Sequence, residues 1–98
     1  MGLMNKYSPD YSTKFKHDRR LLMKRGYDMS KLEVTIDILL QGILMPSEYL
    51  DHPLKGDFVG YRECHVNGES DWILIYKIYK DKLILVLTAT GTHSDLFE

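Results

Sequence analysis

The fold is decided by the stretch Gly60-Tyr61-Arg62-Glu63-Cys64-His65-Val66, read together with Asp71-Trp72-Ile73-Leu74-Ile75-Tyr76-Lys77. Strand alternation places Tyr61, Glu63 and His65 on one face of the first segment and Arg62, Cys64 and Val66 on the other. Asn67-Gly68, between the two segments, tolerates the positive φ angles of a hairpin turn. The second segment is rich in β-branched and aromatic residues, which is typical of a central strand. The stretch therefore predicts a β-hairpin that carries ionisable side chains.

Two helices are predicted before this hairpin. Ser12 or Thr13 caps the first helix, which runs to about Arg25 and stops at Gly26. Its narrow buried stripe consists of Phe15 and Leu22, with Leu21 and Met23 beside them. A short connection around Tyr27-Asp28 then makes the two helices an antiparallel pair.

The second helix has a clear start, core face and end. Ser30-Lys31-Leu32-Glu33 has the pattern of a capping box. Gly42 and Pro46 are stop signals. The residues that recur at the helical period, and so predict the buried face, are Leu32, Ile36, Leu39, Leu40 and Ile43.

Strands flank the two helices. A short strand is predicted at 6–8, and three more at about 58–66, 71–79 and 82–90, after a loop over 46–56. This order predicts an α+β fold with the helices on one face of a mostly antiparallel sheet and a ligand on the open face. Alternation along the last strand places residue 89 on the same side as Leu85 and Leu87. Residues 1–98 form a single domain, with 1–5 expected to be disordered or a leader ahead of a start at Met4.

Charge is distributed unequally along the chain. Residues 1–26 carry seven Lys or Arg against two Asp, a net charge of +5, whereas the remainder carries six basic and twelve acidic residues, a net charge of −6. The first helix is therefore either a basic surface for a polyanion or an ordinary solvated face. Its basic residues are Lys14, Lys16, Arg19, Arg20, Lys24 and Arg25.

Composition narrows the class of protein. The single cysteine, Cys64, excludes an intramolecular disulfide and a cysteine-based zinc site, and is typical of a reducing cytoplasm. No apolar run approaches the roughly 20 residues of a membrane helix, and no signal peptide is visible. We therefore expect a cytoplasmic protein with no membrane partner.

Three histidines and two acids converge at one end of the predicted sheet. His52, His65 and His93 lie on a loop, a strand and the tail, with Glu63 and Asp71 near them. A metal site ranks low, because these spacings match no compact zinc pattern. General acid–base catalysis suits histidine near neutral pH. Cys64 is a weaker candidate for a nucleophile, because alternation turns it away from His65.

Four blocks in this order resemble the YafQ-type toxins of the RelE/ParE superfamily. They are Asp51-His52-Pro53-Leu54-Lys55-Gly56, the two segments of the hairpin, and Thr90-Gly91-Thr92-His93-Ser94-Asp95-Leu96-Phe97. The resemblance covers the chain from about Tyr7 to Phe97. It implies a RelE-like fold and a bacterial type II toxin, an endoribonuclease that enters the ribosomal A site and cuts mRNA without metal or cofactor. It also implies a DinJ-like antitoxin, with the toxin monomeric when free and hetero-oligomeric when bound.

The resemblance also implies roles for particular residues. It makes His52, His65, Asp71 and His93 catalytic: the first two histidines are on the side of the base and His93 is the acid. Phe97 then positions the substrate base by stacking, and the basic helix meets ribosomal RNA. Further substrate contacts are expected from Arg62, Glu63 and Lys55.

Two features depart from the family pattern. The turn over 67–70 is about two residues longer, which keeps strand parity. The chain also reads Thr88-Ala89-Thr90 where the family has an arginine, at Ala89, beside the scissile phosphate. We therefore expect weakened cleavage. Two alternatives stay open: a non-catalytic binding module of the same fold, as in ParE-like gyrase poisons, and a small metal-binding protein.

Overall fold

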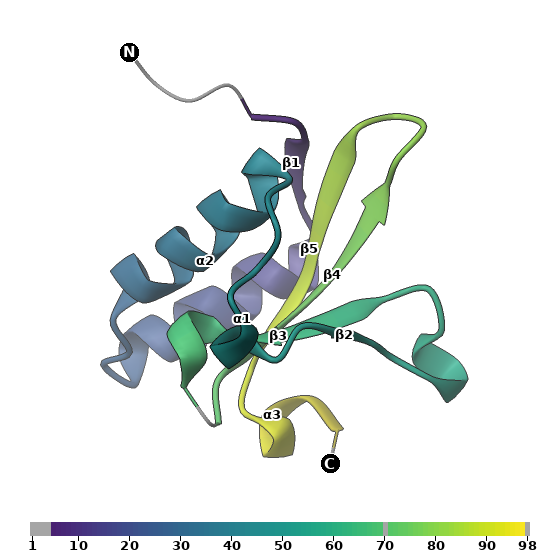
Figure 1. The fold of residues 1–98 in the computed structure, drawn as a ribbon. Coiled ribbons are helices and arrows are strands. Elements are labelled where there is room, and N and C mark those ends of the chain that lie inside the picture. The colour runs from purple at the N-terminus through teal and green to yellow at the C-terminus, as the bar shows by residue number, and fades with distance from the viewer. Residues whose placement is uncertain (1–4, 70, 98) are drawn as a thin grey trace.

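The structure is a computed structural model that describes residues 5–69 and 71–97. Residues 1–4 of the expected leader therefore lie outside the described residues. A five-stranded sheet, with the strand order β1-β5-β4-β3-β2, forms the centre of the molecule (Figure 1). β1 runs parallel to β5, and the other neighbours are antiparallel. The predicted α+β fold with two main helices and a mostly antiparallel sheet is confirmed.

Eight regular helices and strands make up the described chain, joined by three short 3-10 turns over 47–49, 56–58 and 66–68. In chain order they are β1 (Ser8–Tyr11), α1 (Thr13–Lys24), α2 (Met29–Gln41), β2 (His52–Pro53), β3 (Arg62–His65), β4 (Ile73–Tyr79), β5 (Ile84–Gly91) and α3 (His93–Phe97).

Local hydrogen bonds and a glycine set the ends of the two long helices, and one of the predicted ends is wrong. Ser12 is the N-cap of α1, and its hydroxyl accepts the backbone N–H of Phe15 at 2.9 Å. Gly42 closes α2 in the left-handed region with φ of 74°. The predicted capping box at Ser30 is wrong, because the carboxylate of Asp28 accepts the N–H of Ser30 and starts α2 two residues earlier. Ile43 lies beyond this helix and is 55% exposed, so its predicted burial is wrong too.

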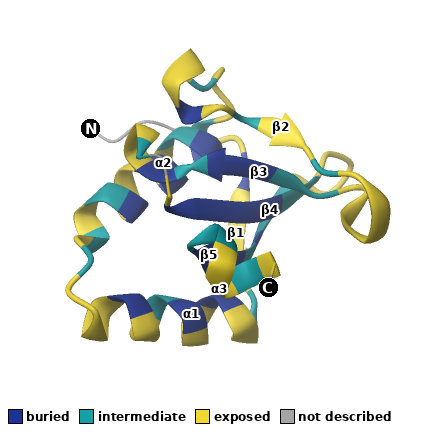
Figure 2. Cartoon of the chain, turned by 90° about the horizontal axis from the view of Figure 1, so that it is seen from below, coloured by how far each residue is buried: buried dark blue, intermediate teal, exposed yellow. Residues whose placement is uncertain are grey.

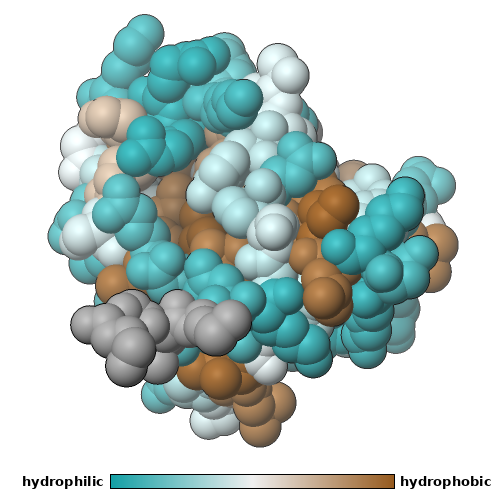
Figure 3. Space-filling view, turned by 90° about the horizontal axis from the view of Figure 1, so that it is seen from above, coloured by the Kyte–Doolittle hydropathy of each residue, from teal (hydrophilic) through white to brown (hydrophobic). Residues whose placement is uncertain are grey.

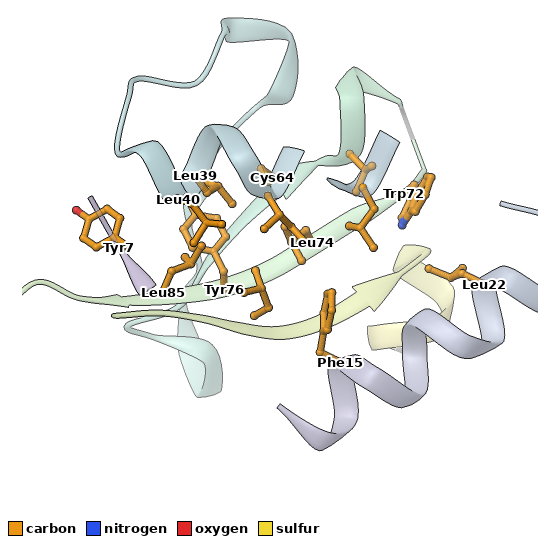
Figure 4. Packing of buried hydrophobic residues seen from close by; sticks show 14 residues of the cluster. Tyr7, Phe15, Leu22, Leu39, Leu40, Cys64, Trp72, Leu74, Tyr76 and Leu85 are labelled. Carbon is orange, nitrogen blue, oxygen red and sulfur yellow. The ribbon is translucent and has the colours of Figure 1, made fainter. Parts of the chain in front are cut away.

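The core lies between the helices and one face of the sheet (Figures 2 and 4). Phe15 and Leu22 of α1 and Leu39 of α2 are buried against it, whereas Leu21 and Met23 are exposed. The sheet, together with the residue after β3 and the residue before β4, contributes to the same cluster Cys64, Val66, Trp72, Leu74, Tyr76, Leu85 and Leu87. Cys64 and Val66 therefore face the helices, as alternation along this segment predicts.

Long-range pairing changes the ends of the strands. β1 starts at Ser8 instead of at residue 6, because its register against β5 runs from Ser8↔Ile84 to Tyr11↔Leu87. Pro9 is tolerated there because β1 is an edge strand. β2 and α3 were not predicted, and the segment expected as a strand from residue 58 is a strand only over Arg62–His65.

A β-bulge in β5 reverses one predicted side-chain direction. Ile75 pairs with Ala89 and Tyr76 with Leu87, so Thr88 is the extra residue. Leu87 faces the helices, whereas Ala89 lies in a row with Ile75 and Glu63 on the opposite face. The prediction that residue 89 shares a side with Leu85 and Leu87 is wrong, because one inserted residue shifts strand parity.

Apolar side chains also reach the surface in patches between polar ones (Figure 3). Leu44, in the loop after α2, is 95% exposed. Among the described residues, no helix combines the length and the apolar character that a membrane span needs.

Candidate functional site

Strand pairing assembles the site on the sheet face opposite α1 and α2. The register His52↔Glu63↔Ile75↔Ala89 runs across four strands, and the next row contains His65↔Ile73↔Gly91. Residues in such a row point to the same face of a sheet. His93 follows two residues after Gly91, at the start of α3. The predicted convergence of three histidines at one end of the sheet is therefore present.

Glu63 is the centre of this cluster. Its side chain is buried, with the residue only 4% exposed, and its Oε2 atom lies 3.6 Å from Nε2 of His52 and 3.4 Å from Nε2 of His93. A buried carboxylate needs a positive partner or hydrogen-bond donors. The one buried carboxylate of Glu63 therefore lies between the imidazoles of His52 and His93.

Backbone carbonyls orient two of the histidines. Nδ1 of His65 lies 2.8 Å from the carbonyl oxygen of Glu69, and Nδ1 of His52 lies 2.7 Å from that of Leu50. A carbonyl only accepts hydrogen bonds, so each Nδ1 carries the proton and Nε2 points to the site. No carboxylate in the described part of the chain forms an ion pair with His65. The Nε2 atom of His65 therefore faces the site with no ion-pair partner among the described residues.

His93 has acids on both sides. Its Nε2 faces Glu63, and its Nδ1 lies 3.7 Å from Oδ1 of Asp71. The His93 ring lies 5.8 Å from the ring of His65 and 6.2 Å from that of Phe97, which is roughly parallel to it. Phe58 in turn meets Phe97 edge-on at 5.3 Å. The longer turn has thus left Asp71 on the side of the histidines, as strand parity predicts.

Three other predicted residues lie outside the cluster. The side chain of Arg62 points to the other face of β3 and pairs with Asp51. Lys55 lies on an exposed loop before the 3-10 turn at 56–58. Cys64 is fully buried in the core, and burial raises the pKa of its thiol well above the ordinary value, so it is no nucleophile.

Asp51 is a site-supporting residue that the sequence reasoning missed. Its carboxylate accepts hydrogen bonds from the guanidinium of Arg62 and the hydroxyl of Tyr76. Burial, together with Asp51, raises the pKa of the Tyr76 hydroxyl. Asp51 directly precedes His52, so this contact ties the loop that carries His52 to β3 and β4. Its position beside a candidate histidine was the only signal in the sequence.

The basic face of α1 is smaller than its sequence predicts. Lys14 pairs with Asp18, Arg19 with Glu33, and Arg25 with Asp95. No acid in the described part of the chain pairs with the three remaining cations. These are Lys16, Arg20 and Lys24, which we call the basic stripe. They are exposed and recur every four residues, so they share one side of the helix.

One group of side chains in the cluster could hold a metal ion. Glu63, His65 and His93 each offer a ligand atom, and these atoms lie within 4.8 Å of one another. One carboxylate and two imidazoles suit a transition metal or zinc. Sequence spacing missed this group because its members come from a strand and a terminal helix.

Comparison with known proteins finds several similar bacterial toxins. The "mRNA interferase toxin YafQ" of Escherichia coli K12 is 47% identical over 89 residues, which are 90% of this chain and 92% of that protein. The E. coli DinJ-YafQ toxin-antitoxin complex contains a chain that matches with a TM-score of 0.84 and 42% identity, over 95% of this chain and 99% of that one. A metal-bound toxin from Helicobacter pylori matches with a TM-score of 0.85 and 36% identity, over 93% and 99%.

The family match covers nearly the whole described fold. Residues 7–98 match the family described as "Bacterial toxin of type II toxin-antitoxin system, YafQ". The chain therefore belongs to the YafQ family of bacterial type II toxins.

Proposed function

We propose that the chain is an mRNA endoribonuclease, the toxin of a type II toxin–antitoxin system, which acts in the ribosomal A site and is silenced by a DinJ-like antitoxin. The observation that carries the proposal is the buried Glu63 between His52 and His93, with His65 beside them. The relative from E. coli K12 is named an mRNA interferase toxin, and a YafQ chain from E. coli is solved in a complex with DinJ. This assembly supplies both a base and an acid within reach of one phosphate.

Cleavage proceeds by attack of the 2′-oxygen on the adjacent phosphorus. His65 removes the 2′-hydroxyl proton, because its Nε2 is free to accept. The bond from phosphorus to the 5′-oxygen breaks, and His93 gives a proton to that oxygen. The products are a 2′,3′-cyclic phosphate and a 5′-hydroxyl end. Oε2 of Glu63 and Oδ1 of Asp71 lie 3.4 and 3.7 Å from the two ring nitrogens of His93, so a carboxylate faces each nitrogen of the proposed acid.

His52 and Phe97 complete this mechanism. His52, whose Nε2 lies 3.6 Å from Oε2 of Glu63, shares the role of base with His65. Phe97 is 40% exposed, and Phe58 supports its ring edge-on. It can therefore stack on the base next to the scissile bond. Lys55 is exposed and can reach RNA, whereas Arg62 acts through Asp51.

Ala89 weakens the reaction in this chain. Its Cβ lies on the face of the histidine cluster, in the row that contains Glu63. The resemblance places an arginine there, and an arginine would donate two hydrogen bonds to phosphate oxygens as charge develops. Loss of one such contact typically lowers the rate by a factor on the order of 10²–10³.

The residues that could hold a metal are the same ones that perform this mechanism. Glu63, His65 and His93 would be its ligands. A bound metal ion would supply Lewis-acid stabilisation of phosphate charge. The proposed route uses the three side chains themselves.

The basic stripe is proposed to contact ribosomal RNA. Lys16 and Lys24 lie about 12 Å apart along the helix, at ~1.5 Å per residue. Three cations over that distance can follow the phosphates of an RNA strand.

The test is translation-dependent mRNA cleavage by the parent chain, by Ala89→Arg and by Ala89→Arg with His65→Gln. We expect weak cleavage by the parent chain and strong cleavage by Ala89→Arg. Adding His65→Gln to Ala89→Arg should lower the cleavage rate of that variant by roughly 10²–10⁴-fold. A non-catalytic binding module, which Ala89 itself favours, predicts no cleavage by any of the three while antitoxin binding persists. Cleavage that disappears with a chelator and returns with metal would instead overturn the metal-free route.

A further inference from the structure

His93, the acid of the proposed mechanism, lies on a helix that is too short to be stable by itself. α3 spans His93–Phe97, about one and a half turns, and has no buried residue. Isolated helices of this length are not stable in water. Something outside α3 must therefore fix the direction in which His93 points.

An ion pair ties α3 to the end of α1. Arg25, the C-cap residue of α1, donates from a guanidinium nitrogen to Oδ2 of Asp95 at 2.8 Å. The same carboxylate accepts the backbone N–H of Thr92 at 2.9 Å, and the N–H of Asp95 donates to the hydroxyl of Thr92 at 3.1 Å. Asp95 therefore both caps α3 and anchors it to Arg25.

A second contact fixes the strand that leads into α3. Asp18 of α1 is buried, and its carboxylate accepts the backbone N–H of Thr90 at 3.1 Å. A Cβ on Gly91 would lie only 3.1 Å from the side chain of Asp95, so α3 folds closely over the end of β5. The chain is thus held by α1 on both sides of Thr92.

Helix geometry explains how this anchor controls the site. His93 and Phe97 are four residues apart and lie on the same side of α3. Asp95 is two residues from each and lies on the other side. With Asp95 held by Arg25, His93 faces Glu63 at 3.4 Å and stacks near Phe97. Rotation of α3 would move both rings out of the site.

We propose that Arg25 and Asp95 are positioning residues, which fix α3 so that His93 meets Glu63 and Phe97 faces the substrate base. This inference rests on the proposed function for its consequence in catalysis, though not for the geometry itself. It also removes Arg25 from the expected RNA contacts, because the guanidinium is held by Asp95.

Two single variants separate positioning from an RNA contact, because the two roles predict opposite effects of Asp95→Asn on the cleavage rate. If Arg25 bound RNA, Arg25→Gln would weaken cleavage and Asp95→Asn, which releases the cation, would strengthen it. Positioning predicts that both variants lower the single-turnover rate of the Ala89→Arg chain by roughly 10- to 100-fold. The double variant should lose no more than either single one. Lys82→Gln, on the exposed turn between β4 and β5, is the control for a lost charge.

NMR of the free toxin tests the position of α3 without any measurement of cleavage. In the free toxin, the imidazole NMR signals of His93 and the ring signals of Phe97 should shift in Arg25→Gln and Asp95→Asn, while the indole N–H of Trp72, in the core, stays in place. If these signals move but no version cleaves RNA, the proposed function has failed and the positioning role stands. Unchanged signals, or faster cleavage by Asp95→Asn, would overturn the positioning role.

Discussion

At the scale of single residues, the site depends on which nitrogen of each histidine carries a proton. Backbone carbonyls fix this for His52 and His65, and two carboxylates surround His93. In the proposed mechanism, the same side-chain type therefore serves as a base in one place and as an acid in another. The difference comes from the hydrogen-bond partner of the second nitrogen.

Ala89→Arg should raise the single-turnover rate of cleavage on the ribosome on the order of 10²-fold, a gain of roughly 3 kcal/mol. The bulge at Thr88 points this position to the histidine cluster, so the guanidinium can reach the phosphate. Ala89→Met controls for side-chain bulk, and Ala89→Lys should gain less because an ammonium group cannot bind two oxygens in a fixed geometry. Equal rates for all four chains would show that residue 89 is not the missing group.

At the scale of elements, the strands β2 and β3 and the short helix α3 carry the candidate site residues, and neighbouring elements hold them in place. Asp51 ties the loop of His52 to β3 and β4, and Lys31 of α2 pairs with Glu69 in the turn that orients His65. Each histidine is therefore positioned by an ion pair or hydrogen bond from a neighbouring element. Such supports are as necessary to a site as the residues that react.

Asp51→Asn should lower cleavage roughly 10- to 100-fold and destabilise the fold by about 1–3 kcal/mol, because Arg62 and Tyr76 lose a charged acceptor. Urea unfolding and single-turnover cleavage measure the two effects. In a chain that already carries His52→Gln, the same change should cost little further activity. An equal loss in both backgrounds would mean that Asp51 does not act through His52. Asp57→Asn, on an exposed loop, is the control.

The basic stripe predicts a salt-dependent contact made by one helix. Reversal of Lys16, Arg20 and Lys24 to Glu should weaken ribosome association. The slope of log affinity against log salt should fall by about 0.7–0.9 for each lost phosphate contact. Lys80→Glu with Lys82→Glu changes charge on the distant β4–β5 turn and should have a much smaller effect. An unchanged slope would assign the stripe to solvent or to the antitoxin.

At the scale of the whole molecule, α1 links the two faces of the fold. Its apolar side packs on the sheet, its basic stripe faces solvent, and its last residues hold α3. The ion pair with Arg25, followed by the N–H of Thr92, lowers the pKa of Asp95 to about 2. The contact between α1 and α3 is therefore intact near neutral pH.

This pKa predicts how folding stability responds to acid. A carboxyl group whose pKa is lowered in the folded state adds stability above its unfolded pKa of about 3.9 and loses it as pH falls toward 2. The free energy of unfolding of Asp95→Asn should therefore change less between pH 4 and 2 than that of the parent chain. The difference should be modest and shrink at high salt, because the pair is partly exposed. Parallel curves would show that Asp95 gains nothing from Arg25.

The sequence by itself determined the parts of this protein that depend on neighbouring residues. The caps at Ser12 and Gly42, the faces of β3 and the turn at Asn67-Gly68 follow from local hydrogen bonds, side-chain period and glycine-like φ angles. The set of candidate histidines was predicted from their residue type and from the four sequence blocks that resemble the family. These features can be predicted without knowing which residues meet across the fold.

Only the tertiary structure decided how these parts meet. The register of β4 against β5 created the bulge that turned Ala89 toward the site, and pairing with β3 made a strand of His52–Pro53. Asp28 displaced Ser30 as the cap of α2, and Arg25, for which the family resemblance implied an RNA contact, was bound by Asp95 seventy residues away. Strand register, the cap of α2 and the partner of Arg25 each depend on which of several possible contacts is most stable in the folded chain. Local propensity and strand alternation do not include the energies of those contacts.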